Sequence, residues 1–190
     1  MDFLPEWLNP FDIIIIFALL GGVALGFVRG LIRMALSLLV LYIATVLAMA
    51  LYIPFGKFLG TIFGLPEAVN EAIGFLLILL ATTIAINFVL HRTYKDTELP
   101  GIRQIDQLGG MVIGFFLTCI WIGLGIAVLS FLLDSLDTGT SVLRTNLIYY
   151  LRTSNLIPIF YAFLPIAFVT LKPWIPKGQL PEIFGLQLFD

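Results

Sequence analysis

The sequence is poor in residues that supply chemistry. Its 190 residues include one cysteine, Cys119, and one histidine, His91. A single cysteine excludes an intramolecular disulfide and a CxxC motif. One histidine without a second ligand cluster gives no support for a metal site. No nucleophile or phosphate-binding motif of the GxSxG, HExxH or P-loop kind occurs. We therefore expect no catalytic residue, no cofactor and no metal, and a protein that is not an enzyme.

Charge is equally scarce. Charged residues make up 12% of the chain and hydrophobic residues 60%, and the net charge is −2. Because soluble domains carry about a quarter charged residues, this composition predicts that lipid is the solvent. The slightly acidic balance gives no electrostatic basis for binding nucleic acid. The N-terminal segment is acidic and lacks a small-residue cleavage site, so it does not have the form of a signal peptide.

Four apolar runs predict an all-α integral membrane protein. The expected spans are residues 11–28, 31–52, 72–90 and 107–133. The first would rise about 27 Å as a helix, close to the thickness of a hydrocarbon core of about 30 Å. We expect residues 1–140 to form a four-helix transmembrane domain. Residues 141–190 are expected to form an amphipathic, interfacial tail that is partly apolar and contains several prolines.

Basic residues predict the orientation of these spans. Arg29 and Arg33 flank the first connection, and Arg92, Lys95 and Arg103 lie in or beside the third. Basic residues favour the cytoplasmic side of short loops. Both termini are therefore expected outside the cytoplasm.

Glycines spaced four apart predict a close contact between helices. Segments 20–27 (LGGVALGF) and 108–115 (LGGMVIGF) are near copies in the first and fourth spans. Glycines on one helix face let a neighbouring backbone approach closely, so we expect the first and fourth spans to pack together. We interpret the similarity as convergent packing rather than as the inverted repeat of a transporter. The expected packing residues are Gly22, Gly26, Gly30, Gly109, Gly110 and Gly114.

Two further segments are less determined by their residues. Gly56, Gly60 and Gly64 form a second glycine ladder, for which a short packed helix and a flexible loop both remain open. Residues 141–157 have the pattern of an interfacial amphipathic helix. Residues 156–171 are apolar but contain two prolines, so we favour an interfacial or re-entrant segment over a fifth span.

The polar residues of the spans are the candidate functional residues. Asp12 and Asp106 open the first and fourth spans, where a carboxylate is expected to cap its own helix. Ion or proton handling is the alternative for both. Arg29 and Arg33 are expected to anchor the topology, with binding of lipid headgroups or of Asp106 also open. The full set is Asp12, Arg29, Arg33, Asn87, Asp106 and Ser154; Asn87 suits hydrogen bonding between helices, and Ser154 has no base nearby in sequence.

The order of these features resembles the colicin V production protein family of bacterial inner-membrane proteins. The residues that carry the resemblance are Asp12, Gly26, Arg29–Gly30, Ala35–Leu38, Asp106, Gly109 or Gly110, Gly114 and Ser154–Pro158. The resemblance implies a bacterial inner-membrane location and a part in production or export of a peptide toxin and in envelope maintenance. Some relatives look like membrane anchors for an external protease domain. No catalytic residue can be carried over.

Two functions follow as hypotheses. The first is a non-enzymatic assembly or interaction module that binds membrane lipids and a membrane or envelope protein. The alternative is a small oligomeric transporter or channel made of several copies of the chain. A pore would gather the polar residues Asp12, Thr82, Thr83, Asn87 and Asp106 around one path.

Overall fold

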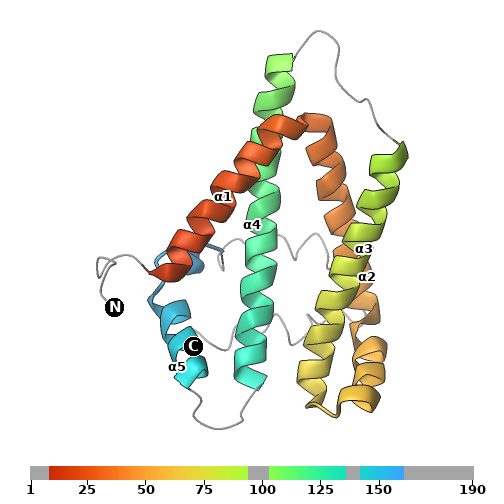
Figure 1. The fold of residues 1–190 in the computed structure, drawn as a ribbon, viewed down its shortest axis with the longest axis vertical. Coiled ribbons are helices and arrows are strands. Elements are labelled where there is room, and N and C mark those ends of the chain that lie inside the picture. The colour runs from red at the N-terminus through yellow and green to blue at the C-terminus, as the bar shows by residue number, and fades with distance from the viewer. Residues whose placement is uncertain (1–8, 94–102, 136–141, 161–190) are drawn as a thin grey trace.

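Five helices form the part of the chain that the structure describes. The computed structural model describes residues 9–93, 103–135 and 142–160, which Figure 1 shows in colour. No strand occurs among these residues, and the predicted all-α class is confirmed. The helices are α1 (Pro10–Arg29), α2 (Leu31–Phe63), α3 (Glu67–Thr93), α4 (Arg103–Ser135) and α5 (Val142–Thr153).

Helices α1 to α4 are long and apolar enough to cross a membrane, which confirms the predicted four-span architecture. Helices α2 and α4 have 33 residues each. A helix of that length measures about 50 Å and exceeds a hydrocarbon core of about 30 Å. The proposed re-entrant segment at 156–171 lies mostly outside the described residues, as does the rest of the tail.

Helix α1 has a defined residue at each end. The Asn9 side chain accepts a hydrogen bond from the backbone N–H of Phe11, and Pro10 occupies the first helical position, where its missing N–H costs nothing. Gly30 ends the helix with φ 78° and ψ 172°, a conformation essentially restricted to glycine. The chain therefore turns from α1 into α2 at a single residue.

Helix α2 continues beyond the predicted second span. It runs through Pro54 to Phe63, and Gly64 ends it in the left-handed conformation at φ 62°, a common way to terminate a helix. The second glycine ladder is thus helical, and the loop alternative is wrong. A Cβ added at Gly56 would lie 2.8 Å from Cα of Glu71 on α3, and one at Gly74 would lie 3.2 Å from the Gly56 nitrogen. Close packing against α3 accompanies the helical conformation here.

Helices α2, α3 and α4 share one core. Ala44, Ala48 and Phe75 are fully buried in it, so small side chains on α2 lie opposite a large one on α3. Lipid offers no hydrophobic drive between helices, and such a core holds by van der Waals contact. Its buried members are Leu41, Ala44, Ala48, Met49, Phe75, Leu79, Leu124, Ala127 and Val128.

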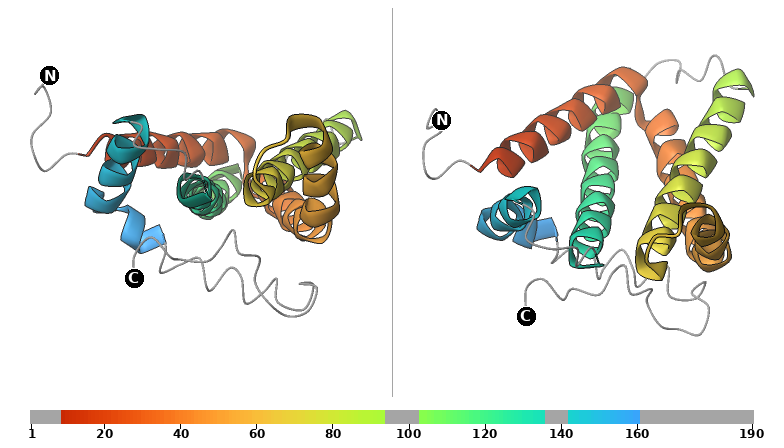
Figure 2. Two further views of the ribbon diagram at one scale, coloured as in Figure 1. Left: turned by 90° about the horizontal axis from the view of Figure 1, so that it is seen from below. Right: turned by 60° about the horizontal axis from the view of Figure 1, so that its bottom comes forward.

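Helix α5 fills the space between α1 and α4. These two helices meet near the end of α1 and diverge toward its start (Figure 1), and Figure 2 shows α5 beside that start. Arg144 Nε donates to the carbonyl of Leu133 at 2.8 Å, which satisfies a carbonyl in the last turn of α4. The second core consists of Ile15, Ile126, Leu133, Leu151, Ile157 and Phe160.

The tail helix is shorter than predicted. Helix α5 ends at Thr153, residues 154–156 are not helical, and a helical turn follows at residues 157–160. The expected continuous helix over 141–157 is therefore wrong at its C-terminal end. The reason lies in the hydrogen bonds of residues 154–156 to α1, described below.

The outer faces of the four long helices are apolar. Phe17 is 70% exposed, Val28 78% and Ile84 66%. Several hydroxyl groups in the helices bond carbonyls of their own helix, as Thr45 does to Leu41 at 2.7 Å and Thr118 to Gly114 at 2.8 Å. A surface of this kind suits lipid, where a polar group must find its partner within the protein.

Candidate functional site

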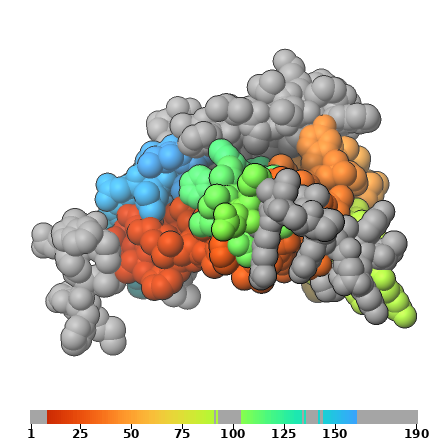
Figure 3. Space-filling view, turned by 90° about the horizontal axis from the view of Figure 1, so that it is seen from above, coloured from red at the N-terminus to blue at the C-terminus, as the bar shows by residue number. Residues whose placement is uncertain are grey.

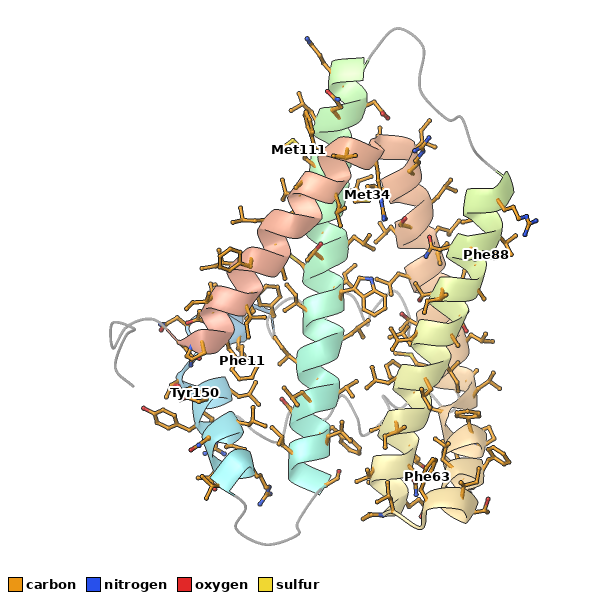
Figure 4. The ribbon with its side chains drawn as sticks, viewed as in Figure 1. Phe11, Met34, Phe63, Phe88, Met111 and Tyr150 are labelled. Carbon is orange, nitrogen blue, oxygen red and sulfur yellow. The ribbon has the colours of Figure 1, made fainter. Side chains whose placement is uncertain are left out.

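Helices α1 and α4 approach so closely that no side chain fits between them at Gly26 and Gly110. A Cβ added at Gly26 would overlap the carbonyl oxygen of Gly110, and one at Gly110 would overlap that of Gly26. In Figure 4, Met34 and Met111 lie near this crossing. Seen from above, α1 and the beginning of α4 lie directly against each other (Figure 3).

The contact extends one helical turn further along both helices. A Cβ at Gly114 would lie 2.5 Å from the Gly22 carbonyl oxygen, and one at Gly22 would overlap the hydroxyl of Thr118. That hydroxyl donates to the Gly114 carbonyl at 2.8 Å, so it needs no partner on α1. We call the contact of Gly22, Gly26, Gly110, Gly114 and Thr118 the glycine seam. Sequence reasoning did not single out Thr118, although it continues the four-residue spacing of α4.

Gly109 lies outside the seam. A Cβ added there would lie 2.8 Å from Cδ1 of Leu31, so this glycine faces the first residue of α2. The predicted packing glycines of α4 therefore meet two different helices: Gly110 and Gly114 contact α1, whereas Gly109 contacts α2.

The seam ends at the turn between α1 and α2, where Asp106 of α4 meets Gly30. The backbone N–H of Leu31 donates to Asp106 Oδ1 at 2.9 Å, and Gly30 itself has no side chain to cap α2. A Cβ at Gly30 would overlap the Asp106 carboxylate. Asp106 was expected to cap its own helix, but this bond goes to the start of α2. We call Gly30 and Leu31 the elbow.

Asn9 joins the other end of α1 to α5. Its amide Nδ2 donates to the Tyr150 carbonyl at 2.6 Å and to Thr153 Oγ1 at 2.9 Å. Phe11 and Tyr150 lie together at this junction in Figure 4. Sequence reasoning missed Asn9. Its position directly before Pro10 is a typical signal for a helix start.

Asp12 holds the segment that follows α5. Asp12 is 5% exposed and Ser154 is 4% exposed. Ser154 Oγ donates to Asp12 Oδ1 at 2.5 Å, and the N–H groups of Asn155 and Leu156 donate to the same carboxylate at 3.2 Å each. Ser154 Oγ in turn accepts from the N–H of Ile157 at 3.2 Å. The prediction that Asp12 caps its own helix is therefore wrong, because Asn9 is the N-cap and Asp12 caps a distant segment.

A family model described as colicin V production protein matches residues 11–165. The chain belongs to the colicin V production protein family. The resemblance predicted from the sequence is thereby confirmed. The matched stretch contains both aspartates together with Leu31 and Ser154, the residues that they bind. No curated protein matches the chain. No solved structure matches it either.

The remaining candidate residues of this family member lie apart from the Asp12 site. Arg29 is exposed in the last turn of α1. The backbone carbonyl of Arg33 accepts from Ser37 Oγ at 2.9 Å. Asn87 Nδ2 donates to the carbonyl of Thr83, one turn earlier on its own helix, at 2.9 Å. The arginines are near the elbow and Asp106, whereas Asn87 is on α3.

The chemistry of the two aspartates is that of hydrogen-bond acceptors at helix starts. Each carboxylate binds donors of a segment far away in the chain, and charge-assisted bonds of this kind are stronger than neutral ones. In the described ranges, no group of three or more His, Cys, Asp or Glu side chains gathers as a metal site would require. The arrangement joins α1 to the α5 segment at one end and α4 to α2 at the other.

Proposed function

We propose that this member of the colicin V production protein family acts without enzymatic chemistry, as an assembly or interaction module of the bacterial inner membrane. Its process in this proposal is the toxin production that the family name denotes, extended to toxin export and envelope maintenance. The observation that supports this proposal is that both aspartates accept hydrogen bonds from other segments of the same chain. Asp12 binds Ser154, Asn155 and Leu156, and Asp106 binds Leu31.

These hydrogen bonds count against a role in proton or ion relay. A carboxylate that takes up a proton or releases its donors to an ion loses charge-assisted bonds, and each such bond contributes about 1.5–3 kcal/mol. A relay group is better placed when its partners are water or other titratable side chains. The intramolecular partners favour a structural use of Asp12 and Asp106.

The polar residues proposed for a pore do not converge within one chain. Asp12 lies at the start of α1 and Asp106 near the start of α4, at opposite ends of this antiparallel pair (Figure 1). Asn87 bonds its own helix. An assembly role is favoured on this ground, with the exposed apolar faces and the exposed Arg29 near the elbow offered to protein and lipid partners.

Native mass spectrometry of the chain extracted together with its lipid tests the proposal. We expect a stoichiometric second membrane or envelope protein, and no ion flux when the purified chain is reconstituted in vesicles. Asp106→Asn serves as the matched variant for flux, because it removes the charge at the elbow. A homo-oligomer without a second protein, conducting an ion flux that Asp106→Asn abolishes, would overturn the assembly role in favour of transport.

A further inference from the structure

The two helices that leave the elbow have different apolar lengths. Asp12 lies 18 residues before Gly30 on α1, and Lys57 lies 27 residues after it on α2. At 1.5 Å per residue, the first charge beyond the elbow region comes after about 27 Å on α1 but only after about 40 Å on α2. Figure 1 shows that α1 is also inclined to α4, which shortens its reach along α4 further.

Helix α2 remains apolar and exposed beyond the level at which α1 starts. Ala50 is exposed, and Leu51 and Ile53 are each 42% exposed. All three are further from Gly30 along the chain than Asp12 is. These exposed apolar side chains suit a hydrocarbon surrounding of α2 at this distance from the elbow.

The surface beside the start of α1 carries exposed polar side chains as well as apolar ones. Helix α5 lies there, held by Asn9 to Tyr150 and by Arg144 to the end of α4. Val142, Tyr149 and Ile159 are exposed on α5 and the turn after it, and beside them five hydrophilic side chains are exposed. We call these five the polar flank, and it consists of Thr145, Asn146, Arg152, Thr153 and Asn155.

Arg152 is the charged member of the polar flank. An exposed arginine is costly in hydrocarbon and is drawn to the headgroup level. Next to it, the N–H of Asn155 bonds Asp12, which fixes Arg152, Thr153 and Asn155 at the depth of the start of α1. Thr145 and Asn146 lie further toward the end of α4, to which Arg144 bonds. Arginine also binds phosphate well, through its planar group of donors.

From this asymmetry we infer that the hydrocarbon layer is thinner along the α1–α5 side of the protein than along α2. Water and phospholipid headgroups reach the start of α1, and the lipid phosphate pairs with Arg152. The nine-residue difference between the two helices corresponds to about 13 Å of axial length, and a bilayer accommodates a short hydrophobic segment by thinning beside it. The inference concerns the surrounding lipid and does not depend on the assembly role.

Spin labels at two positions test this inference in reconstituted vesicles. In a Cys119→Ala background, Asn155→Cys places a label on the polar flank and keeps the backbone N–H that binds Asp12. Ala50→Cys is the matched control on α2, since Ala50 is exposed and lies 20 residues from Gly30. We expect a water-soluble nickel complex to collide several-fold more with the label at 155, and oxygen to collide more with the label at 50.

A bilayer of uniform thickness predicts that the label at 155 is no more accessible to nickel than the label at 50. Ala50 is further from the elbow than Asp12, so its label would then be at least as accessible to nickel as the one at 155. That result would overturn the inference. Circular dichroism of both labelled proteins establishes that the helices are intact.

A second variant tests the part assigned to Arg152. Arg152→Leu is expected to lower nickel access to the label at 155, because the lipid phosphate loses its partner and the hydrocarbon thickens. Arg29→Leu, a change of the same type at the elbow end, should leave that label unchanged. Nickel access at 155 that persists in Arg152→Leu would overturn the pairing of Arg152 with headgroups.

Discussion

At the scale of single residues, the fold depends on two carboxylates that stand at helix starts but bind other segments. Asp12 has three donors from residues 154–156, and Asp106 has the Leu31 N–H. Orphan N–H groups at a helix start need an acceptor, and the N–H groups of Leu31, Asn155 and Leu156 find theirs on these carboxylates. An acidic side chain from a neighbouring helix therefore supplies the acceptor and also fixes the position of that helix.

Replacing Asp12 with asparagine tests the first of these contacts. The amide keeps one acceptor but removes the charge and points a donor toward Ser154 and the N–H groups of Asn155 and Leu156. We expect a loss of unfolding free energy of about 1–3 kcal/mol, measured by denaturation in mixed micelles. Ser154→Ala removes one donor to Asp12 and the acceptor of the Ile157 N–H, but it keeps the carboxylate and the donors of Asn155 and Leu156, so it should cost less. An Asp12→Asn protein as stable as the parent would contradict the capping role.

Gly30→Ala tests the elbow. Alanine at φ 78° and ψ 172° is strained by about 1–3 kcal/mol, and its Cβ would also overlap the Asp106 carboxylate. Gly64→Ala is the comparison, because Gly64 has positive φ in the left-handed region, which alanine adopts at lower cost than the Gly30 conformation, and nothing lies within 4 Å of an added Cβ. We expect Gly30→Ala to lower the melting temperature more than Gly64→Ala, and equal effects would show that Asp106 does not restrict the elbow.

At the scale of helices, the glycine seam decides how α1 meets α4. Gly26→Ala places a methyl group where the Gly110 carbonyl lies, and forced overpacking costs about 1–3 kcal/mol. Gly21→Ala lies on the same helix with nothing within 4 Å, so it should gain about 0.5–1 kcal/mol from helix propensity. Opposite signs of the two changes in unfolding free energy are expected. A destabilising effect of the same size at Gly21 would remove the argument for close contact.

The sequence was sufficient to predict the four long helices, because apolar length and scarce charge are local properties. The four-residue spacing of Gly22, Gly26 and Gly30 also predicted the face of α1 that a neighbouring backbone can approach closely. The continuation of α2 past Pro54 was not predictable in the same way. Proline and a ladder of glycines weaken a helix locally, and the packing that accompanies the helix comes from Glu71 and Gly74 on α3, which only the folded chain brings near.

The Asp12 site shows the same limit more strongly. Asp12 and Ser154 were each singled out, but Ser154 is 142 residues away along the chain from its carboxylate. A single sequence holds no information that pairs such positions. The early end of α5 follows from this pairing, because the N–H groups of Asn155 and Leu156 are turned toward Asp12. The amphipathic pattern of the sequence continues through Asn155 and Leu156, so the pattern alone does not predict where α5 ends.

At the scale of the whole molecule, α4 joins two units that differ in character. On one side it shares a core with the α2–α3 hairpin, and on the other it meets α1 through the glycine seam and α5 through the second core. Exposed Arg29 and Arg92 lie at the elbow end of the helices, whereas Glu67 lies at the other end with Lys57 and Arg152. The charge distribution thus distinguishes the two membrane sides along a single molecular axis.

Reporter fusions test the orientation that follows from this distribution. Because basic residues are retained in the cytoplasm, the elbow end should face inward and the polar flank outward. Alkaline phosphatase fused after Gly64, between α2 and α3, is expected to be active, and green fluorescent protein fused after Thr97 is expected to fluoresce. Exchanged activities would place Arg29 and Arg92 outside. The thinned region beside Arg152 would then lie in the cytoplasmic leaflet, where the supply of anionic headgroups differs.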